Sequence, residues 1–221
     1  MISAADRILK SISKMFASWF GSSSSNRIVF HPSRTCPECG SRLCNRGSCN
    51  SPLRNKDSVW YCPNPDCPAQ IRAQLEHWCS REAMDIAGAD AELVAKLVGA
   101  GLVRDAAELY RLKVAEIAGL EGVDKNSAKN FVDAIAASRR HEAWRLLFGL
   151  DIPCVSVAEA QSFCRHFGSV DNVFAAGVER LRQAEGVSAE AARSLHHWHS
   201  DSVNRRLVRR LFKAGLNFKA G

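Results

Sequence analysis

The sequence predicts a mostly α-helical chain in which a small zinc knuckle is followed by a domain of four helix-hairpin-helix repeats. Three observations support this fold. Two pairs of cysteines stand at metal-ligand spacing in a segment rich in turn residues, apolar positions recur at helical spacing from Gln70 onward, and the helical part repeats itself four times. We therefore divide the chain into an amphipathic helix with a serine linker at 1–25, a zinc finger at 26–70 and the repeats at 71–221.

Composition narrows the class of protein. The chain has 221 residues, of which 46% are hydrophobic, so it can bury a core without disulfide bonds. No stretch reaches the roughly 20 apolar residues that a membrane-spanning helix needs. Six of the nine cysteines lie between Cys36 and Cys67, and this clustering indicates metal binding in a reducing compartment, for which we expect a cytoplasmic location. The net charge of +7 indicates an anionic partner.

The first part is predicted to be an amphipathic helix. Residues 2–20 place apolar side chains at steps of three and four, with basic side chains between them. Gly21 and the serines at 22–25 end the helix and form a flexible linker. Two interpretations are open: the helix docks on a protein partner or on the rest of the chain, or it lies on an anionic membrane surface.

The second part contains a predicted metal site. Two cysteine pairs, each on a tight turn, supply the four thiolates that tetrahedral zinc needs: Cys36, Cys39, Cys62 and Cys67. A closed four-thiolate site leaves no position for water, so this zinc is expected to be structural. Between the pairs stand Cys44 and Cys49, and three roles are open for them: replacing one pair of ligands, binding a second metal, or remaining free thiols.

The third part consists of four copies of one unit. The copies align on four polar residues separated by 34, 32 and 32 positions: Asp90, Asp124, Ser156 and Ser188. Two residues before each of these stands Gly88, Gly122, Cys154 or Gly186. A small residue follows each polar residue at +4 and a large apolar one at +7, which predicts a helix, a tight hairpin and a second helix, with the large residue in the core.

The hairpins carry the predicted nucleic-acid contacts. In a helix-hairpin-helix with a Gly-hydrophobic-Gly turn, the free N–H groups at the start of the second helix donate hydrogen bonds to a DNA phosphate. Here the first glycine is kept at Gly88, Gly122 and Gly186, while the second is replaced in every copy by an N-capping residue that bonds to the same N–H groups. Either the hairpins are only well-capped structural turns, or some still hold DNA weakly, chiefly the second, beside Lys125 and Lys129.

The last 22 residues carry the densest basic cluster, with six Lys/Arg against one Asp. Helical spacing places four arginines on adjoining faces of one helix: Arg205, Arg206, Arg209 and Arg210. They form either an ordinary solvated helix or a surface that contacts phosphates or a partner.

Several stretches resemble the bacterial NAD-dependent DNA ligase family. Thr35–Ser41, Trp60–Gln70 and Ser80–Ile86 resemble its zinc finger and the helices that follow, and Gly119–Gly122, His166–Ser169 and Ala214–Asn217 resemble its four-hairpin domain. The resemblance implies that the outer cysteine pairs, not Cys44 and Cys49, hold the zinc. It also implies a role in DNA replication and repair, because in that family the hairpin domain clamps nicked duplex across the minor groove.

Other parts of that family are absent from this sequence. No lysine begins the Lys-x-Asp-Gly motif that forms the enzyme-adenylate, and the OB and BRCT modules are missing, so we expect neither an NAD site nor autonomous catalysis. The predicted function is non-catalytic, sequence-independent binding of double-stranded or nicked DNA, with modest affinity. Two alternatives are open: an accessory subunit or truncated form of a ligase whose adenylation domain is on another chain, and a structural or interaction protein that has lost DNA binding.

Overall fold

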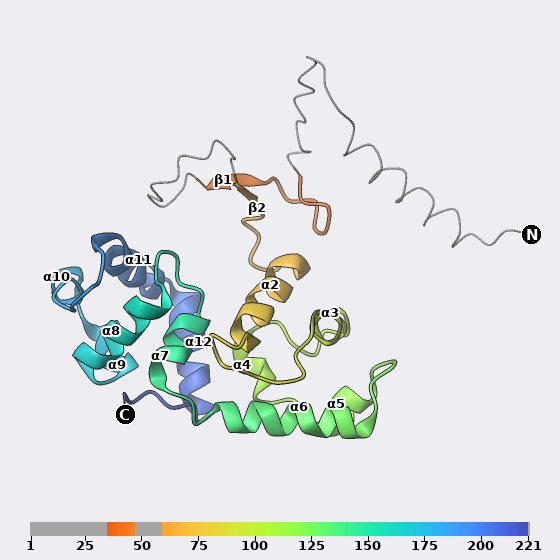
Figure 1. The fold of residues 1–221 in the computed structure, drawn as a ribbon. Coiled ribbons are helices and arrows are strands. Elements are labelled where there is room, and N and C mark those ends of the chain that lie inside the picture. Colours follow the sequence, from red (N-terminus) through yellow and green to blue (C-terminus); the bar gives the residue numbers. More distant parts are fainter. Residues whose placement is uncertain (1–34, 47–58, 221) are drawn as a thin grey trace, which may run out of the picture. The chain divides into compact units, whose positions relative to one another are not determined.

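The computed structural model of the protein describes residues 35–46 and 59–220 (Figure 1). The helix predicted at 2–20, the serine linker and Cys49 lie outside the described residues.

The knuckle contains two short strands that the sequence did not predict. Strand β1 (Cys44–Arg46) pairs antiparallel with β2 (Val59–Tyr61), with Cys44 opposite Tyr61. An isolated bridge between Thr35 and Arg42 extends this pairing toward the first cysteine turn. The strands escape prediction because three-residue strands are too short to show an alternating pattern.

The rest of the described chain is helical, as predicted. Its helices fall into two halves with the same order, followed by one final helix. The first half consists of α2 (Pro68–Cys79), α3 (Ala91–Gly99), α4 (Ala106–Leu109), α5 (Val114–Ala118) and α6 (Lys125–Ser138). The second consists of α7 (Ala143–Gly149), α8 (Val157–Phe167), α9 (Val170–Ala175), α10 (Val178–Leu181) and α11 (Ala189–Ser200), and the last helix is α12 (Ser202–Lys213).

The four hairpins share one backbone conformation, which confirms the predicted repeat. The residue two positions before each cap is left-handed, with φ of +84° at Gly88, +76° at Gly122, +64° at Cys154 and +74° at Gly186. Each cap is extended, with φ between −74° and −81°. Glycine adopts the left-handed conformation without steric cost, whereas the Cβ of Cys154 makes it unfavourable in the third hairpin.

The hairpins are of two alternating kinds. The first and third begin with a second left-handed residue five positions before the cap, Asp85 (φ +44°) and Asp151 (φ +50°). The second and fourth instead share a Glu-Gly-Val sequence directly before the cap. The domain is therefore a duplicated pair of hairpins, each pair containing one hairpin of each kind.

One hydrophobic core runs through both halves. The small residues at +4 are at most 1% exposed and the large residues at +7 at most 2%: Val94, Ala128, Ala160, Ala192, Leu97, Phe131, Phe163 and Leu195. The predicted inward face of each second helix is thus buried in every copy. No helix in the described part of the chain has the length and apolar character needed to cross a lipid bilayer.

The C-terminal segment joins the two halves. Helix α12 packs against α4, where Arg210 forms ion pairs with Asp105 and Glu108. Beyond α12, the backbone N–H of Asn217 donates to the carbonyl of Arg139 at the end of α6 (2.9 Å), and the carbonyl of Phe218 accepts from the N–H of Val170 in α9 (2.9 Å).

The left-handed glycines lead to a stability prediction. A Cβ at Gly88 would meet only Phe131, at 3.9 Å, so the cost of Gly88→Ala is that of the left-handed backbone, about 1 kcal/mol. Gly99→Ala is the control, because this helical glycine has nothing within 4 Å of an added Cβ and should tolerate or favour alanine. Urea unfolding measures both variants, and equal stabilities would contradict the shared hairpin conformation.

Candidate metal centre and nucleic-acid interface

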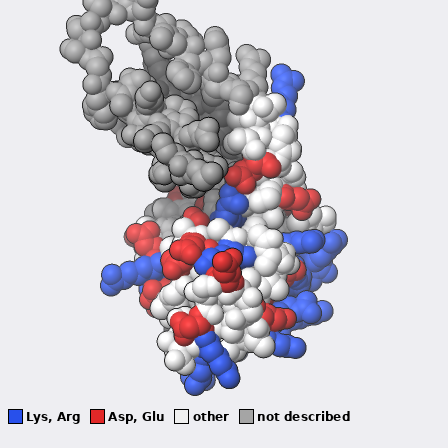
Figure 2. All heavy atoms as spheres, turned by 90° about the vertical axis from the view of Figure 1, so that its right-hand side faces the viewer, with Lys and Arg blue, Asp and Glu red and all other residues white. Residues whose placement is uncertain are grey.

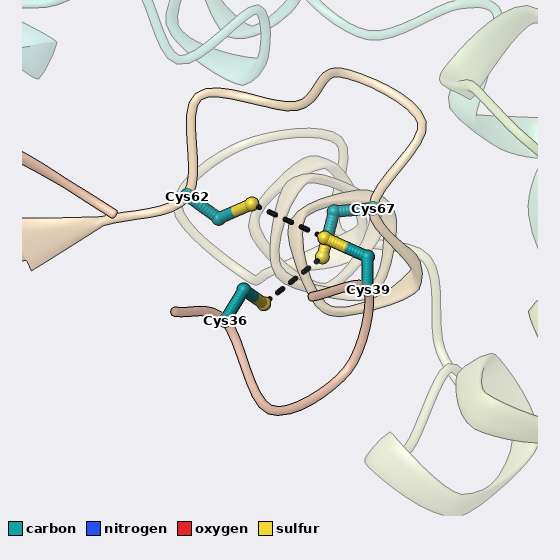
Figure 3. Close-up of side chains that lie close together, drawn as sticks. All are labelled: Cys36, Cys39, Cys62 and Cys67. Atoms are coloured by element: carbon teal, nitrogen blue, oxygen red, sulfur yellow. Dashed lines mark hydrogen bonds between the residues drawn. The ribbon is translucent and has the colours of Figure 1, made fainter. Parts of the chain in front are cut away.

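The structure brings the four outer cysteines together (Figure 3). All four Sγ atoms lie within 4.8 Å of one another, with 3.7 Å between Cys36 and Cys67 and 3.5 Å between Cys39 and Cys62. Tetrahedral zinc with bonds of about 2.3 Å requires sulfur–sulfur separations of about 3.8 Å. The arrangement therefore fits one divalent metal ion, and zinc is the ion that such a sulfur set favours.

Local structure positions each cysteine. Cys36 and Cys39 lie on a turn in which the N–H of Gly40 donates to the Cys36 carbonyl (2.8 Å). Cys67 is the N-cap of α2, is fully buried, and is followed by Pro68, whose fixed φ suits the first helical position. An ion pair between Glu38 and Arg72 (3.2 Å) ties the first cysteine turn to α2.

The thiols need a cation to ionise together. Hydrogen bonding to Ser41 lowers the pKa of Cys39 to about 6, whereas burial raises the pKa of Cys62 to about 12. Four adjacent thiolates would repel one another, and a divalent ion supplies the charge that stabilises them. Cys44 lies exposed on β1 and is not among the four clustered sulfurs.

The first pair of hairpins surrounds a cavity of about 410 Å³ that both hairpin glycines line, Gly88 and Gly122. Asp90 caps α3 by accepting from the N–H of Leu93 (2.7 Å). Asp124 caps α6 by accepting from Asn126 (2.8 Å) and Ser127 (3.0 Å). The predicted caps are thus present in the structure, and they bind N–H groups of the kind that a phosphate would use.

Basic side chains lie both in this cavity and on the exposed surface of α6. Lys96 lines the cavity and forms an ion pair with Glu92 (2.7 Å), while Lys125 and Lys129 are exposed on α6. Figure 2 views the molecule from the right-hand side of Figure 1 and shows acidic and basic side chains interleaved, with basic ones gathered toward one edge. Acidic and basic side chains therefore alternate over much of this face, and basic ones adjoin one another only toward that edge.

A single carboxylate, that of Glu159, bridges the two hairpins of the second pair. Ser156 caps α8 through the N–H of Glu159 (3.3 Å), and Ser188 caps α11 through the N–H of Ala191 (3.1 Å). The Glu159 side chain accepts hydrogen bonds from both serines. Gly186 lies beside this junction, with Ser162 4.0 Å from the position of an added Cβ.

The arginines of α12 have unequal surroundings. Arg210 is held by Asp105 and Glu108, so its charge is neutralised within the chain. Arg205 donates to the carbonyl of Ser200 (2.6 Å), and Arg209 donates through Nε to the carbonyl of Arg205 (3.2 Å). Arg205, Arg206 and Arg209 are exposed. The predicted basic cluster thus divides into three exposed arginines and one internal anchor, Arg210.

Fold and site together define a helix-hairpin-helix protein with a knuckle of four clustered cysteines that could hold a metal ion. The family model described as "Helix-hairpin-helix motif" matches residues 145–208. The chain is 39% identical over 181 residues to a DNA ligase of Synechococcus sp. (strain JA-3-3Ab), a match that covers 82% of this chain and 26% of the ligase. A DNA ligase of Rubrobacter xylanophilus is 39% identical over 189 residues, and this match covers 86% of the chain and 26% of that ligase.

These matches confirm the resemblance to DNA ligases. A third relative, the DNA ligase of Koribacter versatilis, is 37% identical over 185 residues. The chain spans about a quarter of the length of the curated relatives it matches. It is therefore related to a ligase portion that carries the helix-hairpin-helix motif.

Sequence reasoning missed two parts of the site. It identified Ser156 and Ser188 as N-caps, but not the contact of Glu159 with Ser188, because these two residues lie 29 positions apart. It also grouped Arg210 with its neighbours, because helical spacing does not show that Asp105 lies opposite.

The sulfur geometry predicts one metal ion per chain. Cys36→Ser should abolish binding, and Cys44→Ser should leave it intact, because only the first removes a clustered ligand. Metal content and the charge-transfer absorption of the cobalt-substituted protein measure this. Chelation should leave helical circular dichroism nearly unchanged, since the buried cysteine cluster is separate from the main core. Loss of metal in Cys44→Ser would contradict the assigned ligand set.

The cap of the second hairpin predicts opposite effects on stability and binding. Asp124→Gly should lower the melting temperature and tighten duplex binding, because it removes both the cap and a negative charge from the hairpin amides. Hydrogen bonds from the Ser127 side chain and from backbone N–H groups lower the pKa of Asp124. The stability difference between the parental chain and Asp124→Gly is therefore present above pH 3.8, the ordinary pKa of an aspartate. It is lost as the pH falls through the lowered pKa of Asp124.

Asp133→Ala is the matched control for Asp124→Gly, since Asp133 is exposed on the same helix and its loss changes the charge equally. Thermal unfolding and fluorescence anisotropy with a short duplex measure the two effects. Equal binding by the two variants would show that the cap does not compete with phosphate.

Proposed function

We propose that this chain is the DNA-engaging portion of a ligase-like protein and binds duplex DNA through the sugar–phosphate backbone. The observation that carries the proposal is similarity to DNA ligases over more than four-fifths of the chain, combined with the repeated hairpins. Backbone contacts carry no base identity, so the binding is independent of sequence.

The exposed cations support backbone binding. Lys125 and Lys129 follow the second hairpin, and Arg205, Arg206 and Arg209 project from α12. At the hairpins themselves, at Gly88, Gly122 and Gly186, a phosphate must compete with the capping side chains. Binding therefore depends more on these cations than on hairpin amides, and the affinity is modest.

The knuckle supports the binding surface without taking part in chemistry. Cys36, Cys39, Cys62 and Cys67 would hold zinc, whose four thiolate ligands leave no open coordination position. When bound, the ion fixes the first cysteine turn against α2. Sealing of a nick would require an adenylating lysine supplied by a further domain or by another chain, since no lysine here begins a Lys-x-Asp-Gly motif.

A second candidate is an interaction protein that has kept the fold and lost DNA. The capping of all four hairpins favours it, because each cap occupies N–H groups that a phosphate would use. The two candidates differ in their interaction with duplex DNA: only the first predicts binding to a duplex, and this binding weakens as the salt concentration rises.

Fluorescence anisotropy with a nicked duplex over a salt series tests the proposal. Neutralising two to four phosphates gives a slope of log K against log salt between about −2 and −4. Arg206→Ala should make this slope shallower by about 1 without changing stability, because Arg206 is exposed.

Arg210→Ala serves as the comparison on the same helix. It should lower thermal stability, because it leaves Asp105 and Glu108 unpaired at the contact between α12 and α4, with little effect on the salt slope measured in the folded chain. Absence of any salt-dependent binding by the parental chain would overturn the proposed function and favour the interaction protein.

A further inference from the structure

The third and fourth hairpins are joined by a single carboxylate. Oε2 of Glu159 accepts from the N–H and the hydroxyl of Ser156, each at 2.9 Å. Its Oε1 accepts from the hydroxyl (2.7 Å) and the N–H (3.2 Å) of Ser188, 29 residues further along the chain. Both oxygens of one anion are thus bound by donors from two hairpins.

These donors are of the kind that binds a backbone phosphate. Each hairpin presents a turn N–H and a hydroxyl beside the N-terminus of its second helix, where negative charge is favoured. The carboxylate satisfies all four donors at once. The hydrogen bonds from the two serines also stabilise its ionised form and lower the pKa of Glu159 against the opposing effect of partial burial.

The first pair of hairpins lacks a carboxylate that is shared in this way. The residue equivalent to Glu159, three positions after the cap, is Leu93, which cannot accept hydrogen bonds. The position six after the cap differs as well: Lys96 lies near Gly122 in the first pair, where Ser162 lies near Gly186 in the second. The first junction therefore holds Lys96, which is paired with Glu92, beside two separate aspartate caps. In the second junction one carboxylate binds both hairpins.

We propose that Glu159 is an internal occupant of the phosphate position shared by the third and fourth hairpins, so that duplex DNA is excluded from the second pair. This inference rests on the proposed function. It restricts the DNA-binding surface to the first pair and α12, and it assigns the second pair a structural role in holding its two hairpins together.

The test is Glu159→Ala in the full chain, with duplex DNA as the probe. Removing the carboxylate frees the four donors, so one additional phosphate is neutralised and the slope of log K against log salt steepens by about 1. When the salt is lowered from 200 to 50 mM, the affinity of Glu159→Ala for the duplex should then rise about 3.5-fold more than that of the parental chain. Glu185→Ala is the control, because Glu185 is exposed in the fourth hairpin and its loss changes the charge equally.

Three further measurements keep the test decisive. Circular dichroism checks that the variants fold. Glu159→Gln should change the salt slope in the same direction as Glu159→Ala. This variant keeps the side-chain volume but places an amide N–H₂ group against one set of donors. Amide hydrogen exchange in the parental chain should show protection at Ser188 that is lost in Glu159→Ala. An unprotected Ser188 amide in the parental chain would overturn the proposal without any DNA experiment.

The binding outcomes separate this proposal from the proposed function. A steeper slope in Glu159→Ala than in Glu185→Ala supports internal occupancy. Equal slopes in the parental chain and both variants overturn it while the proposed function stands. Absence of binding in the parental chain and all variants overturns both.

Discussion

The fold depends on a left-handed residue placed two positions before the cap of each second helix. This residue reverses the chain within a few positions, and the extended cap that follows starts the next helix at a fixed angle. Three of the four copies use glycine there, and Cys154 keeps the same backbone at a steric cost. Because all four hairpins obey this constraint, the large residues seven positions after the caps meet in one core.

The same turns determine which backbone N–H groups are available to bind an anion. Every second helix begins with free N–H groups, and in this chain aspartate and serine side chains bind them. A cap stabilises the helix and at the same time competes with phosphate. The repeated replacement of glycine therefore moves the hairpins toward a structural role and leaves most of the attraction for DNA to exposed lysines and arginines.

Much of this architecture was predictable from local sequence patterns. The cysteine spacing selected the four clustered sulfurs once a family resemblance distinguished them from Cys44, and the repeated offsets located all four hairpins. Contacts between distant segments were not predictable. Glu159 reaches Ser188 only because two hairpins pack together, and Arg210 meets Asp105 only because the last helix returns to the first half. Neither contact leaves a periodic signal in the sequence.

We propose that one duplicated hairpin fold presents two unlike junctions, of which only the first faces DNA. Amide chemical-shift mapping during titration with a short duplex tests this directly. We expect saturable changes at the amides around Gly88 and Gly122 and along the outer face of α12, with little change around Ser156 and Ser188. Changes concentrated around Ser156 and Ser188, or no saturable change anywhere, would contradict it.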